Sequence, residues 1–193
     1  IEKPLNHLNQ KFESSANSSI LNYKVNYSKK NLHFLSGFSI KKSNNLKMGS
    51  NRIHGYKNWG KEEIITSNNE QLRTSYWQTD FMHKTLLSLS KTSSILFNTQ
   101  YSNSSKINRF DKLNDLQNNT NKYTNWYYGP QKRLLQSVTV NNNKKYFFAD
   151  NLNFLFAFQN LNESRHVQKK DDAYITNRHE DLLIFDINLN VNK

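Results

Sequence analysis

The chain has no cysteine, two prolines and five glycines among its 193 residues. The absence of cysteine excludes a disulfide framework and a thiolate metal site. The sequence also contains no apolar run long enough for a membrane-spanning helix and no apolar core of a secretory signal peptide. It begins IEKPLN without an initiator methionine. We therefore expect a processed chain or a part of a larger protein.

The sequence motifs of common enzymes are also lacking. The chain has no glycine-rich phosphate loop, no nucleophile elbow and no thiol nucleophile, and its six histidines form no His-x-x-x-His pair. His166 and His179 flank one segment and are candidates to coordinate haem iron or a metal complex, but an isolated pair is more typical of a surface. We predict that the protein is not an enzyme and has no cofactor.

The net charge of +12 is compatible with a polyanionic partner, such as nucleic acid or lipopolysaccharide phosphates, or with a solvated surface. The cations are scattered over most of the chain, and no RNA-binding or zinc motif accompanies them. Nucleic acid is therefore not an expected partner.

Apolar residues are few but patterned. They make up 35% of the chain and the mean hydropathy is −0.88, yet 13% of residues are aromatic, which disordered chains rarely show. Asparagine accounts for roughly a sixth of the residues and favours turns and loops. The apolar residues recur at every second position, which predicts half-buried strands. We expect seven strands and no helix, in a sequential antiparallel meander, at about 19–27, 31–42, 71–89, 94–103, 134–140, 147–160 and 180–190.

The predicted connections alternate in length. Those at 28–31, 91–93 and 141–145 are short, whereas those at 42–70, 104–133 and 163–179 are long. Such alternation is typical of outer-membrane β-barrels, in which periplasmic turns are short and extracellular loops are long. The apolar strand faces would then contact outer-membrane lipid and the polar faces a wet lumen. The alternative is a soluble β-sandwich whose core contains the same aromatic residues.

Six segments occur in a fixed order along the chain: HGYKNWG (54–60), QTDFMHKTLLSLS (78–90), NRFDKLND (108–115), WYYGPQKRLLQSV (126–138), FQNLNESRHVQKK (158–170) and NRHEDLLIFDINL (177–189). Together, over about residues 54–190, they resemble the barrel region of TonB-dependent outer-membrane receptors of the type common in Bacteroidota. The resemblance implies a bacterial outer-membrane location and a barrel of about 22 strands with a plugged lumen. It also implies import of a scarce nutrient, such as an iron chelate, haem or cobalamin, with energy from the TonB complex.

The chain departs from that family at both ends. No plug domain or TonB box is visible, and the end at Asn192-Lys193 lacks a terminal aromatic strand. We expect residues 1–193 to be an internal part of the barrel domain, an open sheet with two unpaired edges. The TonB complex would then be contacted through a plug domain that is absent here. The alternative function is a soluble extracellular binding module, an adhesin or a carbohydrate-binding sandwich, that stacks the same aromatic residues on sugars.

Two sets of residues are candidates for contact with a ligand or the plug. The stretch YTNWYYGPQKR (123–133) supplies Trp126, Tyr127, Tyr128 and Gln131, beside a Gly129-Pro130 pair that predicts a turn where a loop re-enters the wall. Its aromatic residues either form an interfacial girdle or line a ligand vestibule. The second set is charged and either binds a ligand or the plug or forms structural ion pairs. It comprises Arg109 and Asp111 in one loop, and Glu163, Arg165, Arg178 and Glu180, which a hairpin is expected to bring together.

Overall fold

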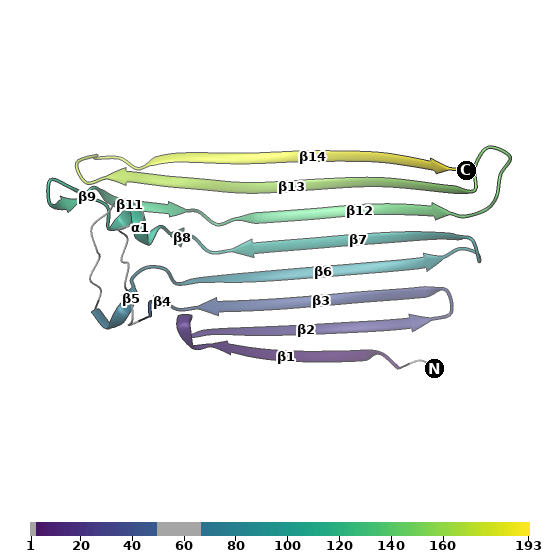
Figure 1. Ribbon diagram of the computed structural model, residues 1–193, viewed down its shortest axis with the longest axis horizontal. Helices are drawn as coiled ribbons and strands as arrows, with labels where there is room; N and C mark the ends of the chain where they lie inside the picture. Colours follow the sequence, from purple (N-terminus) through teal and green to yellow (C-terminus); the bar gives the residue numbers. More distant parts are fainter. Residues whose placement is uncertain (1–2, 50–66) are drawn as a thin grey trace.

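The computed structural model describes residues 3–49 and 67–193, so the segment 54–60 lies outside the described residues. The described chain folds into one open antiparallel sheet of ten strands and two small two-stranded ribbons (Figure 1). The strands of the large sheet are β1 (Leu5–Glu13), β2 (Ser18–Lys29), β3 (Leu32–Ser43), β6 (Tyr76–Ser88), β7 (Ser93–Ser104), β8 (Ile107–Asn108), β11 (Tyr123–Tyr128), β12 (Lys132–Asn142), β13 (Asn151–Lys169) and β14 (Thr176–Asn192). The other elements are β4 (Leu46–Lys47), β5 (Glu70–Gln71), β9 (Leu116–Gln117), β10 (Thr120–Asn121), the 3₁₀ turns η1 (Ser14–Ala16) and η3 (Ser67–Asn69), and the one-turn helix α1 (Phe110–Leu113).

The long strands follow one another across the sheet in the order β1-β2-β3-β6-β7-β12-β13-β14. The predicted all-β antiparallel meander is therefore confirmed. Eight long strands replace the seven predicted, because β1 was missed. Its sequence LNHLNQKFE lacks a strict apolar alternation, yet it pairs with β2 from Leu5 opposite Asn26 to Glu13 opposite Ser18. Backbone hydrogen bonds to β2, rather than a clean apolar pattern, hold this edge strand.

The predicted long connection at 163–179 is wrong. β13 and β14 pair without interruption from Asn151 opposite Asn192 to Val167 opposite Thr176, which leaves 170–175 as the connection. The η1 turn lies at the same end of the sheet as the long loops and is also short. The long connections at this end are therefore those between β3 and β6 and between β7 and β12 (Figure 1). At the opposite end, the β12–β13 connection runs over 143–150, and Phe147 lies in it rather than in a strand.

The strand register separates two faces, because residues opposite each other on antiparallel strands share a face. One row, for example, joins Tyr23, Phe38, Phe81, Tyr101 and Leu134 across five strands. We call this side the apolar face. Its large hydrophobic residues are Leu8, Phe12, Leu21, Tyr23, Val25, Tyr27, Leu32, Phe34, Phe38, Ile40, Trp77, Phe81, Leu87, Ile95, Phe97, Tyr101, Leu134, Val138, Val140, Leu152, Phe154, Phe156, Phe158, Leu183, Phe185, Ile187, Leu189 and Val191.

Charged strand residues are nearly all on the other side, which we call the polar face. On the apolar face, the described strands carry Asp, Glu, Lys or Arg only near its margins: Lys29 toward the short turns, and Lys42, Lys132 and Asp181 toward the long loops. The polar face carries Lys11, Glu13, Lys24, Lys41, Asp80, Lys84, Arg133, Glu163, Arg165, Lys169, Arg178, Glu180 and Asp186.

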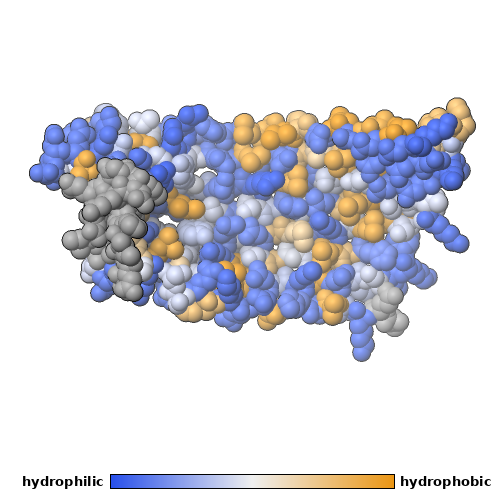
Figure 2. Space-filling model, in the orientation of Figure 1, coloured by the Kyte–Doolittle hydropathy of each residue, from blue (hydrophilic) through white to orange (hydrophobic). Residues whose placement is uncertain are grey.

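The polar face is hollowed. A cavity of about 580 Å³ includes Lys24, Asp80, Gln100 and Arg133 in its lining. Within it the carboxylate of Asp80 accepts a hydrogen bond of 2.7 Å from the Ser102 hydroxyl. One broad side of the sheet is seen in Figure 2 and is mostly hydrophilic, with hydrophobic side chains gathered along the edge where β13 and β14 lie.

The described residues form almost no hydrophobic core. Their buried apolar side chains are Ala16, Phe110, Leu113, Trp126, Ala149 and Ala157, three of them alanines. On the apolar face, by contrast, Phe185, Ile187 and Leu189 are 64%, 70% and 65% exposed. No helix in the described part of the chain is long and apolar enough to cross a membrane. An uncovered apolar surface of this extent is unfavourable in water, so it requires an apolar partner surface.

Candidate functional site

Most of the predicted site residues gather on the polar side of the sheet, at the end that carries the long loops. Tyr127 is the exception, since it points to the apolar side and stacks on His166 with ring centroids 4.5 Å apart. The nine on the polar side are Arg109, Asp111, Trp126, Tyr128, Gln131, Glu163, Arg165, Arg178 and Glu180.

A β-bulge determines which way the aromatic residues point. Lys132 of β12 lies opposite Asn162, and Tyr128 of β11 lies opposite Arg165. Between these pairs, the three residues 129–131 oppose the two residues 163–164, so one strand holds one extra residue. Such an insertion reverses the alternation of side chains along the strand. Even-numbered residues of β12 therefore face the apolar side, whereas Trp126 and Tyr128 in β11 face the polar side.

This bulge corrects the predicted turn at Gly129-Pro130. The aromatic segment is itself a strand, paired with both β13 and β8, rather than the end of a loop. Gly129 is required by close approach: a Cβ atom there would lie 2.0 Å from the Ser164 Oγ and 2.8 Å from the His166 Nε2. Its backbone N–H donates to the Ser164 carbonyl at 2.8 Å. Pro130 has no N–H to leave unpaired at the break in the ladder.

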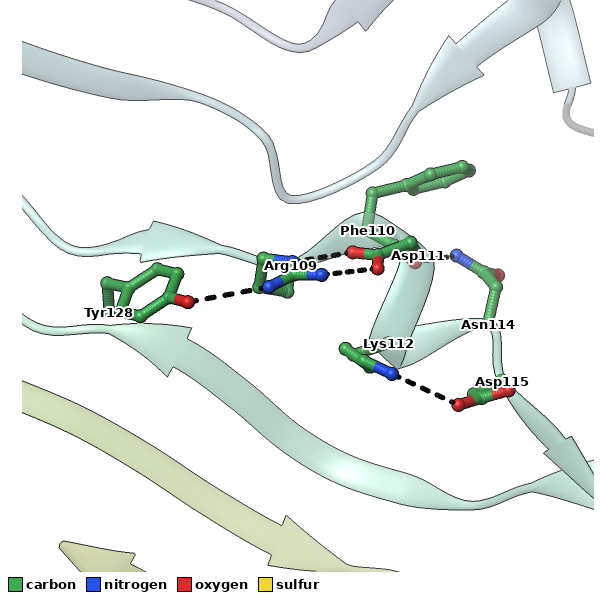
Figure 3. Close-up of polar contacts among 7 residues, drawn as sticks. All are labelled: Arg109, Phe110, Asp111, Lys112, Asn114, Asp115 and Tyr128. Carbon is green, nitrogen blue, oxygen red and sulfur yellow. Dashed lines mark hydrogen bonds and ion pairs between the residues drawn. The ribbon is translucent and has the colours of Figure 1, made fainter. Parts of the chain in front are cut away.

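Arg109 is the centre of the loop cluster (Figure 3). Its Nε and Nη2 atoms donate to the two carboxylate oxygens of Asp111 at 2.7 and 2.6 Å, and its Nη1 lies 3.4 Å from the Tyr128 hydroxyl. The guanidinium carbon lies 4.9 Å from the centroid of the Trp126 ring. The hydrogen bonds from Arg109 lower the pKa of the Asp111 carboxyl, and those to Asp111 raise the pKa of Arg109. A two-point pair of this kind fixes the guanidinium plane over the indole.

Helix α1 gives the loop a small core of its own. Phe110, Leu113 and Trp126 are all buried, and Trp126 is only 8% exposed. The Leu113 N–H donates to the Arg109 carbonyl at 3.0 Å, and the Asn114 side-chain amide donates to the Phe110 carbonyl at 2.7 Å. The cluster around Arg109 is thus internally packed.

The charged set on β13 and β14 comes together as predicted, but like charges lie opposite each other. Glu163 is opposite Glu180, and Arg165 is opposite Arg178. The ion pair runs along β14 instead, from Arg178 Nε to Glu180 Oε1 at 2.7 Å, while Glu163 accepts a hydrogen bond from Gln131. These four charged residues line a small cavity of about 90 Å³ together with Tyr128 and Ser164. Arg165 has no side-chain hydrogen bond or ion pair with any described residue, so its guanidinium can bind an anion.

Sequence reasoning missed a second cavity beside α1. It has a volume of about 650 Å³ and is lined by Glu70, Leu72, Arg73, Phe110 and Tyr123, with Lys170 from the β13–β14 connection. Arg73 and Lys170 lie about a hundred residues apart, in segments without any motif. No local pattern in the sequence predicts that these two residues line one cavity.

The two histidines considered as metal ligands do lie together. The rings of His166 and His179 are 5.5 Å apart between centroids. However, His166 Nδ1 lies 2.6 Å from Asn177 Oδ1 and its Nε2 lies 2.9 Å from Ser164 Oγ, so both ring nitrogens already have partners. In the described part of the chain, no three His, Cys, Asp or Glu residues are grouped as a metal site would require.

Comparison with protein-family models, with curated proteins and with solved structures finds no match for this chain. The interpretation of the site therefore depends on its geometry.

The close approach at the bulge is testable. We expect Gly129→Ala to lower the folded fraction markedly, because the new methyl group collides with Ser164, and Ser164→Gly in the same chain to restore part of the loss. Folding is measured by the denaturant midpoint in detergent, with Gly49→Ala as the matched control, since no atom lies within 4 Å of a Cβ there. Equal midpoints for Gly129→Ala and Gly49→Ala would contradict this account.

The Arg109–Asp111 ion pair beside Trp126 predicts a pH dependence. Because the folded-state pKa of Asp111 is lowered, its contribution to stability is complete above the unfolded-state pKa of about 3.9 and is lost as the pH falls through that value and below. We expect Asp111→Asn to destabilise α1 by about 1 kcal/mol at neutral pH, and to remove this acid dependence. Hydrogen exchange of the Leu113 and Asn114 amides measures both effects. Lys112→Gln, which removes only the longer 3.7 Å pair with Asp115, should change exchange less.

Proposed function

We propose that the chain is a segment of the wall of a TonB-dependent outer-membrane receptor that imports a small, scarce nutrient. In this arrangement, the apolar face contacts lipid and the polar face lines the lumen. The loop end with the Arg109 cluster and Arg165 is then extracellular and contacts the nutrient or the plug. The family is proposed from the sequence resemblance, and the geometry of the sheet supports the part of the proposal that concerns a lipid-facing wall.

The supporting observation is the segregation of charge between the two faces. On β14, the apolar residues Leu183, Phe185, Ile187, Leu189 and Val191 form an unbroken line on one face. At about 3.4 Å per residue, this line is roughly 27 Å long along the strand. A strand tilt of 35–45° reduces it to about 20 Å across the membrane, most of the apolar band of about 25 Å on outer-membrane barrels. On β2, β3 and β12 the charged residues of this face lie at the end of each strand's own apolar line, and they are Lys29, Lys42 and Lys132.

One polar triplet inside the band is hydrogen-bonded within itself. His83 lies in the middle of the apolar face, where its Nδ1 is 2.7 Å from Ser36 Oγ and its Nε2 is 2.9 Å from Thr85 Oγ1. A buried or lipid-facing imidazole is tolerated when both nitrogens have hydrogen-bond partners. The triplet is therefore compatible with a hydrocarbon environment.

A soluble β-sandwich is the second candidate, and it would need a second layer over the apolar face. In the described chain, the elements outside the large sheet are the short ribbons, turns and helix, which lie at the loop end (Figure 1). They leave the strand middles uncovered. A second layer would have to come from another part of the protein or from another molecule, so the membrane assignment is favoured.

Two adjacent residues of β14 test the lipid contact. We expect Ile187→Arg to reduce outer-membrane assembly of the receptor that contains this segment, because a lipid-facing cation near the midplane costs about 2–4 kcal/mol. Asn188→Arg places the same charge one residue away, on the polar face opposite Leu155, and should assemble normally. Assembly is measured by outer-membrane fractionation and by heat-modifiable migration on gels. Equal assembly of both variants would exclude lipid contact for this face.

Neighbouring tyrosines test the ligand contact. Tyr128 is on the polar side and Tyr127 on the apolar side, so we expect Tyr128→Ala to weaken nutrient binding by roughly 1–3 kcal/mol, the scale of an aromatic hot spot. Tyr127→Ala should leave binding per folded receptor unchanged. Haemin, cobalamin and a ferric hydroxamate are the probes, each measured with purified receptor. If wild-type protein binds one of them and Tyr128→Ala binds it equally well, this side of the loop does not contact the nutrient.

A further inference from the structure

Three lysines mark the loop-side margin of the apolar face, and we call them the basic margin: Lys42, Lys106 and Lys132. Lys42 ends the apolar line of β3 and lies opposite Trp77 of β6. Lys132 begins β12 and lies opposite Asn103 and Asn162. Lys106 follows β7, and its Nζ lies 5.2 Å from the centroid of the Tyr127 ring. Since Tyr127 stacks on His166 on the apolar side, the Lys106 ammonium lies on that side too.

No carboxylate of the described residues forms an ion pair with the basic margin. The ion pairs among described residues use Lys11, Lys41, Arg109, Lys112 and Arg178, and none involves Lys42, Lys106 or Lys132. Asp181 is the one strand carboxylate at this margin of the apolar face, and it accepts a hydrogen bond from Asn162. Three cations without an ion pair among the described residues, two of them beside the aromatic residues Trp77 and Tyr127, lie at the end of the apolar face. Such a surface matches anionic headgroups above acyl chains.

We propose that the basic margin binds the phosphate groups of an anionic glycolipid of the lipid A type in the outer leaflet, with the acyl chains against the apolar face. This inference rests on the proposed function, because it requires the apolar face to contact lipid with its long loops outward. Trp77 and Tyr127 lie at the level expected for an interfacial aromatic girdle. Ser164, Asn177 and His179 extend the same margin with further polar groups across β13 and β14. At the opposite margin, Lys29 is the strand cation on this face, so the loop side carries the larger cluster.

The experiment compares two charge-matched double variants of the intact receptor in neutral detergent. One is Lys106→Gln with Lys132→Gln, and the other is Lys24→Gln with Lys84→Gln on the polar face. Native mass spectrometry measures binding of lipid A and of its dephosphorylated form, which has the same acyl chains. We expect wild type to prefer lipid A, and the basic-margin variant to lose about tenfold or more of its affinity, since one basic residue near an anionic surface contributes about fivefold. The polar-face variant should bind as wild type does.

The outcomes separate this inference from the function on which it rests. Heat-modifiable migration on gels is measured first on the same samples, because it reports assembly of the receptor. A wild-type protein that does not assemble in the outer membrane would contradict the proposed function. With assembly intact, equal binding of lipid A and its dephosphorylated form would overturn the phosphate site. Equal loss of affinity in the two double variants would also overturn it, because the effect would then follow net charge rather than the basic margin.

Discussion

The apolar face determines how the rest of this structure can exist. Its large side chains are exposed in a single sheet, and the buried apolar residues of the described chain are too few and too small to compensate. The free energy of folding must therefore include the burial of this face against another apolar surface. Every other feature is compatible with such a surface: the charges lie on the opposite face, the His83 imidazole is paired with Ser36 and Thr85, and the lysines stop at the margins.

The bulge at 129–131 connects this constraint to the candidate site. If β11 continued the alternation of β12, Trp126 and Tyr128 would point to the apolar side and Tyr127 to the polar side. The extra residue exchanges them, which sets the indole beneath Arg109 and places the Tyr128 hydroxyl near the guanidinium. Gly129 permits the exchange because a Cβ atom there would lie 2.0 Å from the Ser164 Oγ in the present arrangement. The one extra residue at the bulge thus decides which aromatic rings face the polar side, where the candidate site lies.

Sequence patterns were sufficient for the features that repeat. Alternation such as Leu183, Phe185, Ile187 and Leu189 predicted the class of fold, the antiparallel order and the facing of most strands. The patterns failed where cross-strand hydrogen bonds outweigh the side-chain pattern. β1 has an irregular sequence, and the polar residues 163–167 of β13 and 176–179 of β14 are strands because these segments pair with each other. The Gly129-Pro130 pair predicts a turn, because the sequence does not reveal the close contact that Gly129 makes with Ser164 on the neighbouring strand. The hairpin that joins Glu163 to Glu180 was predicted, whereas like charges opposite each other require the register, which the sequence did not provide.

Arg109 and Arg165 differ in how much of their charge is used by neighbouring residues of the protein. Arg109 is bound at two points by Asp111, stacked on Trp126 and supported by a buried helix turn, so its charge is largely used within the protein. Arg165 lies opposite Arg178 and has no side-chain partner among the described residues, whereas Arg178 is paired with Glu180 and Glu163 accepts a hydrogen bond from Gln131. Two guanidinium groups opposite each other repel, which raises the free energy of the sheet, and an anion bound between them would lower it. Among the described residues Arg165 has no side-chain partner, whereas Arg109 contacts Asp111, Tyr128 and Trp126. Under the proposed receptor function, an anionic group of the plug or the nutrient would supply the partner that Arg165 lacks.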